Sequence, residues 1–303
     1  MKLAFAYVSV IVIWASTPLA ITISNRGFSF WAAGALRMAI AVCVLLPIVW
    51  LRAAPFWGNG KTLQSYLLGA LGVLPNTLLV YWSAQYVPSG LISVAYSLSP
   101  FVVGVFSYVL LRDGEFTARR ALALLVAAVG MAIIYVDQLH IDRESAYGVI
   151  ALVGAVLAWG ASAVGLKHLN VNVDPMCQTA GALLFSLPGL ITCWWLFDGT
   201  VPVDPALDSL VAIVGLAIIG SIVGFSLYYY VLNRMSAVNT SFITLIVPII
   251  ALTLGVVTAG ETLSLRLIVG VAIVLSSLFV YLNIGYRLLL RRVSGRFAKA
   301  EIS

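Results

Sequence analysis

Apolar stretches of about 20 residues recur from one end of this chain to the other, separated by short polar segments. A helix of that length crosses the roughly 30 Å hydrocarbon core of a bilayer. Hydrophobic residues make up 62% of the sequence and charged residues only 9%, against roughly 25% charge in a soluble domain. The sequence therefore predicts an all-α polytopic membrane protein, because a soluble core could not bury this much apolar surface.

Ten membrane spans are predicted, and their connections are too short to hold a separate soluble domain. The first is interpreted as a membrane helix and not as a cleavable secretory signal, since its apolar stretch is longer than a signal core. The spans lie near residues 3–24, 28–50, 65–86, 89–111, 117–135, 146–168, 175–197, 209–232, 237–259 and 265–284.

Lysine and arginine are concentrated in alternate connections, as expected when basic residues are retained on the cytoplasmic side. With the N-terminus inside, only Arg26, Arg143 and Arg266 fall in outer loops, and Arg37 falls within the second span. The other thirteen fall on the inner side: Lys2, Arg52, Lys61, Arg112, Arg119, Arg120, Lys167, Arg234, Arg287, Arg291, Arg292, Arg296 and Lys299. Both termini are thus predicted to be cytoplasmic, and residues 287–303 to form a basic tail near anionic lipid head groups.

The second half of the chain repeats unusual features of the first at an offset of 145 to 148 residues. The matched pairs, in chain order, are Trp14 with Trp159, Ala33-Gly34-Ala35-Leu36 with Ala180-Gly181-Ala182-Leu183, Tyr81 with Tyr229, Ser93 with Ser241, Pro100 with Pro248, and Gly114-Glu115 with Gly260-Glu261. Each copy holds five spans, an odd number, so the second copy enters the membrane from the opposite side. The pattern predicts a first five-helix repeat over residues 1–140 and an inverted second repeat over 141–286, an arrangement that alternating-access carriers use.

These features resemble the ten-helix, EamA-type exporters of the drug/metabolite transporter superfamily. The resemblance is carried by Trp14-Ala15-Ser16-Thr17-Pro18 with its echo Trp159-Gly160-Ala161-Ser162, by Ala35-Leu36-Arg37, and by the proline followed by Gly-Glu in each half. It implies an alternating-access carrier in the cell membrane, the inner membrane of a bacterium, that exports small metabolites. The aromatic-rich spans resemble the aromatic amino acid exporter branch, which implies amino acids with aromatic or other apolar side chains as cargo. A broad drug or metabolite efflux carrier is the alternative within this class.

Two prolines that match between the repeats predict a site at mid-membrane depth. Pro100 and Pro248 lie about 16 Å into the fourth and ninth spans, counted at 1.5 Å per residue. Each removes one intrahelical hydrogen bond, so the carbonyls of Tyr96 and Thr244 need another partner. Either these prolines border a central pocket, or they form kinks that only shape helix packing.

Other polar and aromatic side chains near mid-depth are candidates for lining such a pocket. Together with Tyr96 and Thr244, the predicted substrate-binding residues are Trp14, Asn76, Ser99, Trp159 and Ser162. Tyr96 and Ser99 share a helical face, as do Trp159 and Ser162, so rings alternate with hydroxyl groups. Such a lining suits a flat apolar solute with polar ends, although ordinary helix packing is the alternative role for each residue.

Three further residues have candidate roles in transport. Tyr81 and Tyr229 lie on opposite sides of their span centres and are predicted to act as outer and inner gates, with interfacial belting as the alternative. Arg37 is the charge well inside a span, and such charges are costly and often functional. It is a candidate contact for a substrate carboxylate, and the favoured alternative is a structural bond to neighbouring carbonyls or to acidic residues of the loops.

Acidic residues in the span centres and the common catalytic and metal-binding motifs are missing from the sequence. Because the predicted span centres hold no Asp or Glu, the carrier is expected to be a facilitator or exchanger without tightly coupled protons. No P-loop, HExxH motif, serine triad or Cys/His cluster is present, so neither an enzyme nor a cofactor or metal site is predicted. The expected partners are a small-molecule substrate and membrane lipids, with no nucleic acid. A lipid-processing membrane enzyme and a channel are the alternatives from other classes.

Overall fold

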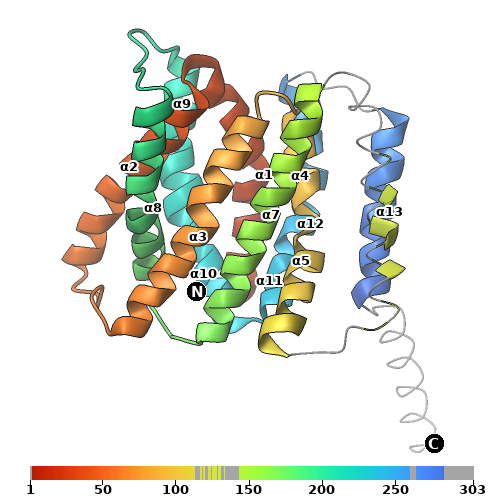
Figure 1. The fold of residues 1–303 in the computed structure, drawn as a ribbon, viewed down its shortest axis with the longest axis horizontal. Coiled ribbons are helices and arrows are strands. Elements are labelled where there is room, and N and C mark those ends of the chain that lie inside the picture. The colour runs from red at the N-terminus through yellow and green to blue at the C-terminus, as the bar shows by residue number, and fades with distance from the viewer. Residues whose placement is uncertain are drawn as a thin grey trace, which may run out of the picture. The chain divides into compact units, whose positions relative to one another are not determined.

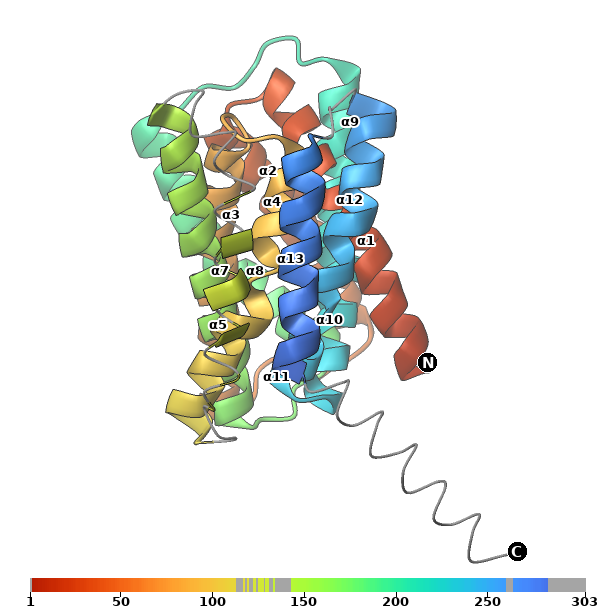
Figure 2. The same cartoon turned by 90° about the vertical axis from the view of Figure 1, so that its right-hand side faces the viewer.

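The computed structural model describes residues 2–112, 143–259 and 264–282, together with scattered positions between 117 and 133. The regular structure of these residues is helical (Figures 1 and 2). The helices are α1 (Leu3–Gly27), α2 (Phe30–Leu51), α3 (Gly60–Ser83), α4 (Ser89–Tyr96), α5 (Ser99–Phe106), the π-helix η1 (Ser107–Leu111), α7 (Arg143–Leu169), α8 (Pro175–Phe197), α9 (Leu207–Gly215), the π-helix η2 (Leu216–Val223), α10 (Gly224–Arg234), α11 (Ala237–Ser241), α12 (Ile243–Ala259) and α13 (Leu265–Leu282).

The chain forms two compact units, and each takes segments from both halves of the sequence. The larger unit comprises residues 1–114 and 141–262, and the smaller comprises residues 115–140 and 263–303. In the larger unit α3 packs against both α7 and α8, and α1 packs against α12 (Figure 2). In the smaller unit Gly130 lies close to α13, where an added Cβ would be 3.0 Å from the carbonyl oxygen of Gly270.

Seven described helical segments are long and apolar enough to cross a membrane, which agrees with a polytopic membrane protein. They are Leu3–Gly27, Phe30–Leu51, Gly60–Ser83, Ser89–Leu111, Ser145–Leu169, Pro175–Phe197 and Leu207–Arg234, and two shorter apolar stretches, Ala237–Pro248 and Ile268–Ser277, follow. Each corresponds to a predicted span. Most of the predicted span 117–135, both Gly-Glu pairs and the predicted tail 287–303 lie outside the described residues.

Side-chain caps fix the N-terminal ends of α3 and α8, and the cap of α3 explains why that helix begins earlier than predicted. The Asn59 side chain accepts a hydrogen bond from the Thr62 amide at 3.1 Å, so α3 begins five residues before the predicted start. Asp174 caps α8 by accepting from the Met176 and Cys177 amides at 2.9 and 3.2 Å. The next residue, Pro175, occupies the first turn, where a missing amide hydrogen costs nothing.

The two proline-containing regions break in different ways. Helix α4 ends at Tyr96 and α5 begins at Ser99, with Pro100 in the first turn of α5. In the second region the break falls at Phe242, between α11 and α12, while Pro248 lies inside α12. The Thr244 hydroxyl donates to the Ser241 carbonyl at 2.7 Å and so gives that carbonyl, on the other side of the break, a hydrogen-bond partner. Both breaks lie in helices that reach the interior of the larger unit.

Candidate functional site

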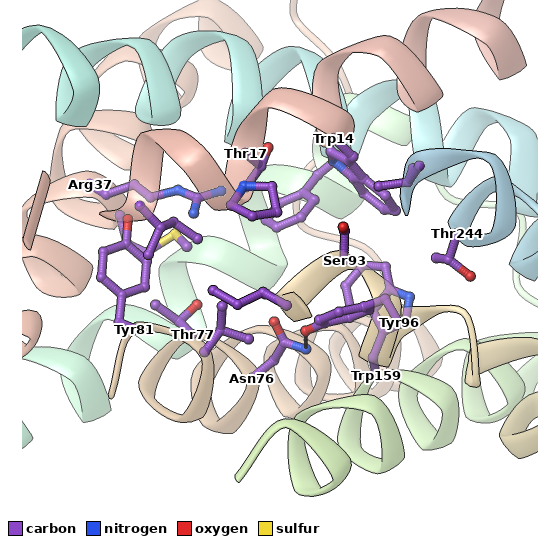
Figure 3. A pocket seen from close by; sticks show the side chains of 17 residues that line it. Trp14, Thr17, Arg37, Asn76, Thr77, Tyr81, Ser93, Tyr96, Trp159 and Thr244 are labelled. Carbon is purple, nitrogen blue, oxygen red and sulfur yellow. Dashed lines mark hydrogen bonds between the residues drawn. The ribbon is translucent and has the colours of Figure 1, made fainter. Parts of the chain in front are cut away.

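A cavity of about 100 Å³ lies inside the larger unit (Figure 3). Helices α1, α2, α3, α4, α7, α10 and α12 all contribute to its lining, so residues far apart in the sequence meet there. Its aromatic and polar lining residues are Trp14, Thr17, Arg37, Asn76, Thr77, Tyr81, Ser93, Tyr96, Trp159, Phe225 and Thr244.

Packed aromatic rings form one end of the cavity. The Trp14 and Trp159 centroids are 5.4 Å apart in an edge-to-face arrangement, and Phe225 lies 6.0 Å from Trp159. Tyr228 packs behind them, 5.1 Å from Trp14 and 4.8 Å from Trp159. These spacings are typical of favourable ring pairs, so this end offers a preformed apolar surface to another ring. Below, "aromatic cluster" denotes Trp14, Trp159, Phe225 and Tyr228.

A hydrogen-bonded amide and phenol form part of the cavity wall. The Asn76 side-chain amide donates to the Tyr96 hydroxyl and, at 3.1 Å, to the backbone carbonyl of Ala155 (Figure 3). These bonds join α3, α4 and α7 at the height of the cavity. Because Asn76 uses both amide hydrogens in this way, its side chain is held in one orientation.

A buried cation lies at the other end of the cavity. Figure 3 shows Arg37 and Tyr81 on one side and Trp14, Trp159 and Thr244 on the other. Arg37 is only 5% exposed, and its Nε donates to the Ser221 hydroxyl at 2.9 Å. Within the described part of the chain, no acidic side chain forms an ion pair with Arg37, and the cavity lining contains no Asp, Glu or His.

Seven of the residues selected from sequence come together in this cavity: Trp14, Arg37, Asn76, Tyr81, Tyr96, Trp159 and Thr244. They lie on six different helices, and in the sequence they were linked only by the repeat pattern and by their predicted depth in the membrane. Tyr81 is 1% exposed overall, and among the described residues its hydroxyl has no hydrogen-bond partner.

The remaining selected residues lie outside the cavity lining. The Ser162 hydroxyl donates to the Leu68 carbonyl at 2.7 Å, because α7 approaches α3 closely at Gly72 and the helix interface takes up that side chain. Ser99 is fully buried away from the cavity. Tyr229 is buried and packs beside Gly69, where an added Cβ would lie 3.2 Å from the tyrosine hydroxyl. Pro100 and Pro248 shape the neighbouring helices without lining the cavity.

Four polar or aromatic lining residues were not predicted as such from the sequence: Thr17, Thr77, Ser93 and Phe225. Thr17 follows Trp14 by three residues, so helical spacing alone could have placed it on the same face. Thr77 is adjacent to Asn76, and its selection depends on the rotation of α3. Phe225 is one of many apolar residues in its span and carried no distinguishing signal.

Long apolar helices around an internal cavity of mixed aromatic and polar character define the class of a multi-pass membrane transporter. The family model for the EamA-like transporter family matches residues 1–136 and 146–283. The chain therefore belongs to the EamA-like transporter family.

Similar proteins are also named as transporters. The chain is 22% identical over 282 residues to the transporter YoaV of Bacillus subtilis (strain 168), covering 92% of this chain and 96% of that protein. It is 27% identical over 257 residues to the inner membrane transporter YedA of Escherichia coli (strain K12), covering 84% and 81%. A solved crystal structure superposes with a TM-score of 0.69 at 18% identity, covering 92% of this chain and 96% of that one, which shows a shared fold.

Proposed function

We propose that this transporter is an alternating-access carrier that exports small metabolites, working as a facilitator or exchanger. Amino acids with aromatic or other apolar side chains are the first candidate cargo. The observation that carries this proposal is the two-ended cavity, with a guanidinium at one end and the aromatic cluster at the other. A carboxylate can bind the first end while a ring packs on the second.

The proposed architecture has ten spans in two inverted repeats, with both termini in the cytoplasm. Support comes from two family-model matches of similar length, one in each half of the chain. The helix breaks after Tyr96 and at Phe242 also occur in corresponding spans of the two halves. An inverted repeat gives the molecule two related conformations, which is what alternating access requires.

In this orientation the cavity would open toward the outer side. Its lining comes from the outer half of α1, the C-terminal end of α3 and the C-terminal half of α4, which belongs to the outer part of the fourth span. On the inner side of the aromatic cluster, α3 and α8 pack closely, and Gln178 exchanges hydrogen bonds with Ser65. Tyr229 fills the space between Gly69 and this interface, as an inner gate would, and Tyr81 takes the role of the outer gate.

The cavity lining favours movement of the solute without a coupled proton. Asp, Glu and His do not occur among its residues, and the charged group that lines it is the Arg37 guanidinium. A cationic drug entering the cavity would be repelled by that guanidinium. This charge favours a carboxylate-bearing metabolite over the alternative, a broad carrier of cationic drugs.

A counterflow screen in proteoliposomes tests the proposal. The panel holds amino acids, nucleosides, sugars and cationic dyes, and the expected result is saturable exchange of aromatic amino acids. Tyr96→Ala and Trp159→Leu should abolish this exchange, whereas Trp195→Leu, at a side chain 71% exposed on the lipid-facing surface, should retain it. Flux of dyes alone, or equal loss in the control variant, would overturn the proposal.

A further inference from the structure

The charge of the cavity is unbalanced. Arg37 is the charged residue of the lining, it is almost fully buried, and its described side-chain partner is the neutral hydroxyl of Ser221. Cations held inside a membrane protein are usually paired, because an unpaired buried charge is strongly unfavourable. An anion that enters the cavity would supply the missing charge.

The guanidinium is fixed through its Nε at the edge of the cavity, while its two outer nitrogens have no described hydrogen-bond partner. Its Nε is bound by Ser221, whose hydroxyl donates in turn to the Leu216 carbonyl at 3.1 Å, five residues back along the π-helix η2. Gly220 leaves room beside the side chain, since an added Cβ there would lie 3.4 Å from Nη2 of Arg37. No hydrogen bond from either Nη atom to a described residue is present, which leaves these donors for a carboxylate.

A second unused donor lies at the same end. The Tyr81 hydroxyl is buried and has no described hydrogen-bond partner, and Figure 3 shows it directed toward the Arg37 side chain. An unsatisfied buried hydroxyl is costly, so a ligand oxygen would relieve it. The hydroxyls of Ser93 and Thr244 instead donate to backbone carbonyls at 2.7 Å each. They retain lone pairs for a cation, but no negative charge to balance it.

We propose that the preferred substrates are organic monoanions, with one carboxylate and an aromatic or apolar body and without a balancing ammonium group. The inference rests on the proposed function, export of small metabolites through this cavity, and changes the preferred cargo of that cavity from amino acids to organic monoanions. A monoanion neutralises Arg37, whereas a zwitterionic amino acid leaves the occupied cavity with the same net charge as the empty one. Amino acids are therefore weaker substrates than the matching acids that lack the ammonium.

Monoanion transport moves charge across the membrane. Arg37 remains with the protein, and the lining contains no Asp, Glu or His that could carry a proton with the solute. Each exported molecule therefore carries one negative charge outward, and an inside-negative potential drives it. At 2.3 kcal/mol per charge for 100 mV, the potential sustains an outward gradient of about 50-fold.

A matched pair of solutes tests the inference in the wild-type carrier. L-Phenylalanine and 3-phenylpropanoate share a ring and a carboxylate and differ in the α-ammonium. Transport currents and radiolabelled uptake are measured at pH 7.5 in proteoliposomes, with a potassium/valinomycin potential and protein-free liposomes as background. The expected result is at least about tenfold lower KM for 3-phenylpropanoate, because burying the ammonium of phenylalanine near Arg37, in a lining without an acidic partner, costs at least that factor. Its current should have the sign of a moving anion.

Variants separate the anion site from general damage to the protein. Arg37→Met should abolish the current, and Ser221→Ala should raise KM more than it lowers maximal flux, because Ser221 only orients the guanidinium. Arg26→Met, which removes an exposed positive charge at the end of α1, should leave both unchanged.

The possible results distinguish failure of the monoanion inference from failure of the proposed function. Saturable phenylalanine exchange without preference for 3-phenylpropanoate overturns the inference and leaves the proposed function standing. Uptake of 3-phenylpropanoate without current also overturns it, since the solute would then move with a proton. Movement of neither solute, in a preparation that exchanges nucleosides or dyes, overturns the proposed function itself.

Discussion

Replacing Gly69 with alanine should shift the carrier out of the conformation described here. An added Cβ at this position would lie 2.7 Å from Cβ of Ala182, 2.9 Å from Nε2 of Gln178 and 3.2 Å from the hydroxyl of Tyr229. Carbon atoms in contact are normally about 3.5–4.0 Å apart. The Ala182 methyl cannot rotate away, so α3 and α8 must separate to admit the new group.

Overpacking of this kind costs about 1–3 kcal/mol in a well-packed core. If the α3–α8 contact closes the inner side, the substitution raises the free energy of the closed conformation alone. The ratio of inner-open to inner-closed molecules should then rise about 5- to 150-fold. If the contact instead persists in both conformations, the same energy appears as lost thermal stability without a change in this ratio.

The assay is the labelling rate of a cysteine that, in the proposed orientation, lies on the inner side of the aromatic cluster. Ser226, in α10, is half-buried and hydrogen-bonded to Thr179 of α8 at 3.2 Å, so Ser226→Cys reports opening there. The native cysteines Cys43, Cys177 and Cys193 are replaced by alanine in the background. A membrane-impermeant maleimide applied to the inner face should react 5- to 150-fold faster in Gly69→Ala, in line with about 1–3 kcal/mol.

Gly189→Ala is the matched control, because it lies in the same pair of helices but faces a movable side chain. Its added Cβ would meet the Leu74 side-chain end at 2.8 Å, and leucine can change rotamer. Labelling in this control should stay at the background rate. A Gly69→Ala protein that melts earlier yet labels at the background rate would refute the inner-gate reasoning.

Three further outcomes are expected. Asn76→Leu and Tyr96→Phe should each lower the free energy of unfolding by about 1–2 kcal/mol. Because the two side chains share one hydrogen bond, the double variant should lose less than the sum of the single losses, and additive losses would show that this bond contributes nothing. Counterflow at fixed potential should vary less than twofold between pH 6 and 8; a steeper profile would indicate a titrating group in the pathway. Gly224→Ala, whose Cβ would lie 2.9 Å from Nε1 of Trp14, should weaken aromatic solute binding about tenfold, whereas Gly215→Ala, in open space, should not; equal effects would remove the aromatic cluster from the site.

The membrane-spanning helices were predictable because their signal is local. A run of about 20 apolar residues is recognisable without knowledge of its neighbours, and each of the seven long described segments was anticipated from such a run. Boundaries were less accurate where a single cap decides them. The start of α3 at Gly60, after the Asn59 cap, is the example.

Part of the site was also predictable, and the limit is helix rotation. Trp14, Asn76, Tyr96 and Trp159 were selected by depth and type, and they do line one cavity. Ser162 has the same depth and type, but the absence of a side chain at Gly72 brings α7 so close to α3 that Ser162 is buried in the interface. That distance depends on packing between segments far apart in the chain.

The setting of Arg37 was beyond sequence reasoning for a different reason. Its position in the membrane was evident, but its partner was not, because Ser221 reaches it from a π-helical turn. A π-helical segment such as η2 has no residue pattern that predicts it, although π-helical geometry is frequent at functional sites.

The central claim is that the cavity between the aromatic cluster and Arg37 is the site through which solute passes. Ser93 lines that cavity from α4, so Ser93→Trp fills it. Val12→Trp adds the same ring to α1 at a side chain that is 56% exposed and faces away from the protein interior. The decisive measurement is counterflow of radiolabelled 3-phenylpropanoate and phenylalanine by the two variants at equal reconstituted amounts. If solute passes through this cavity, both fluxes are lost in Ser93→Trp and remain at wild-type rates in Val12→Trp. Wild-type flux through Ser93→Trp would contradict it.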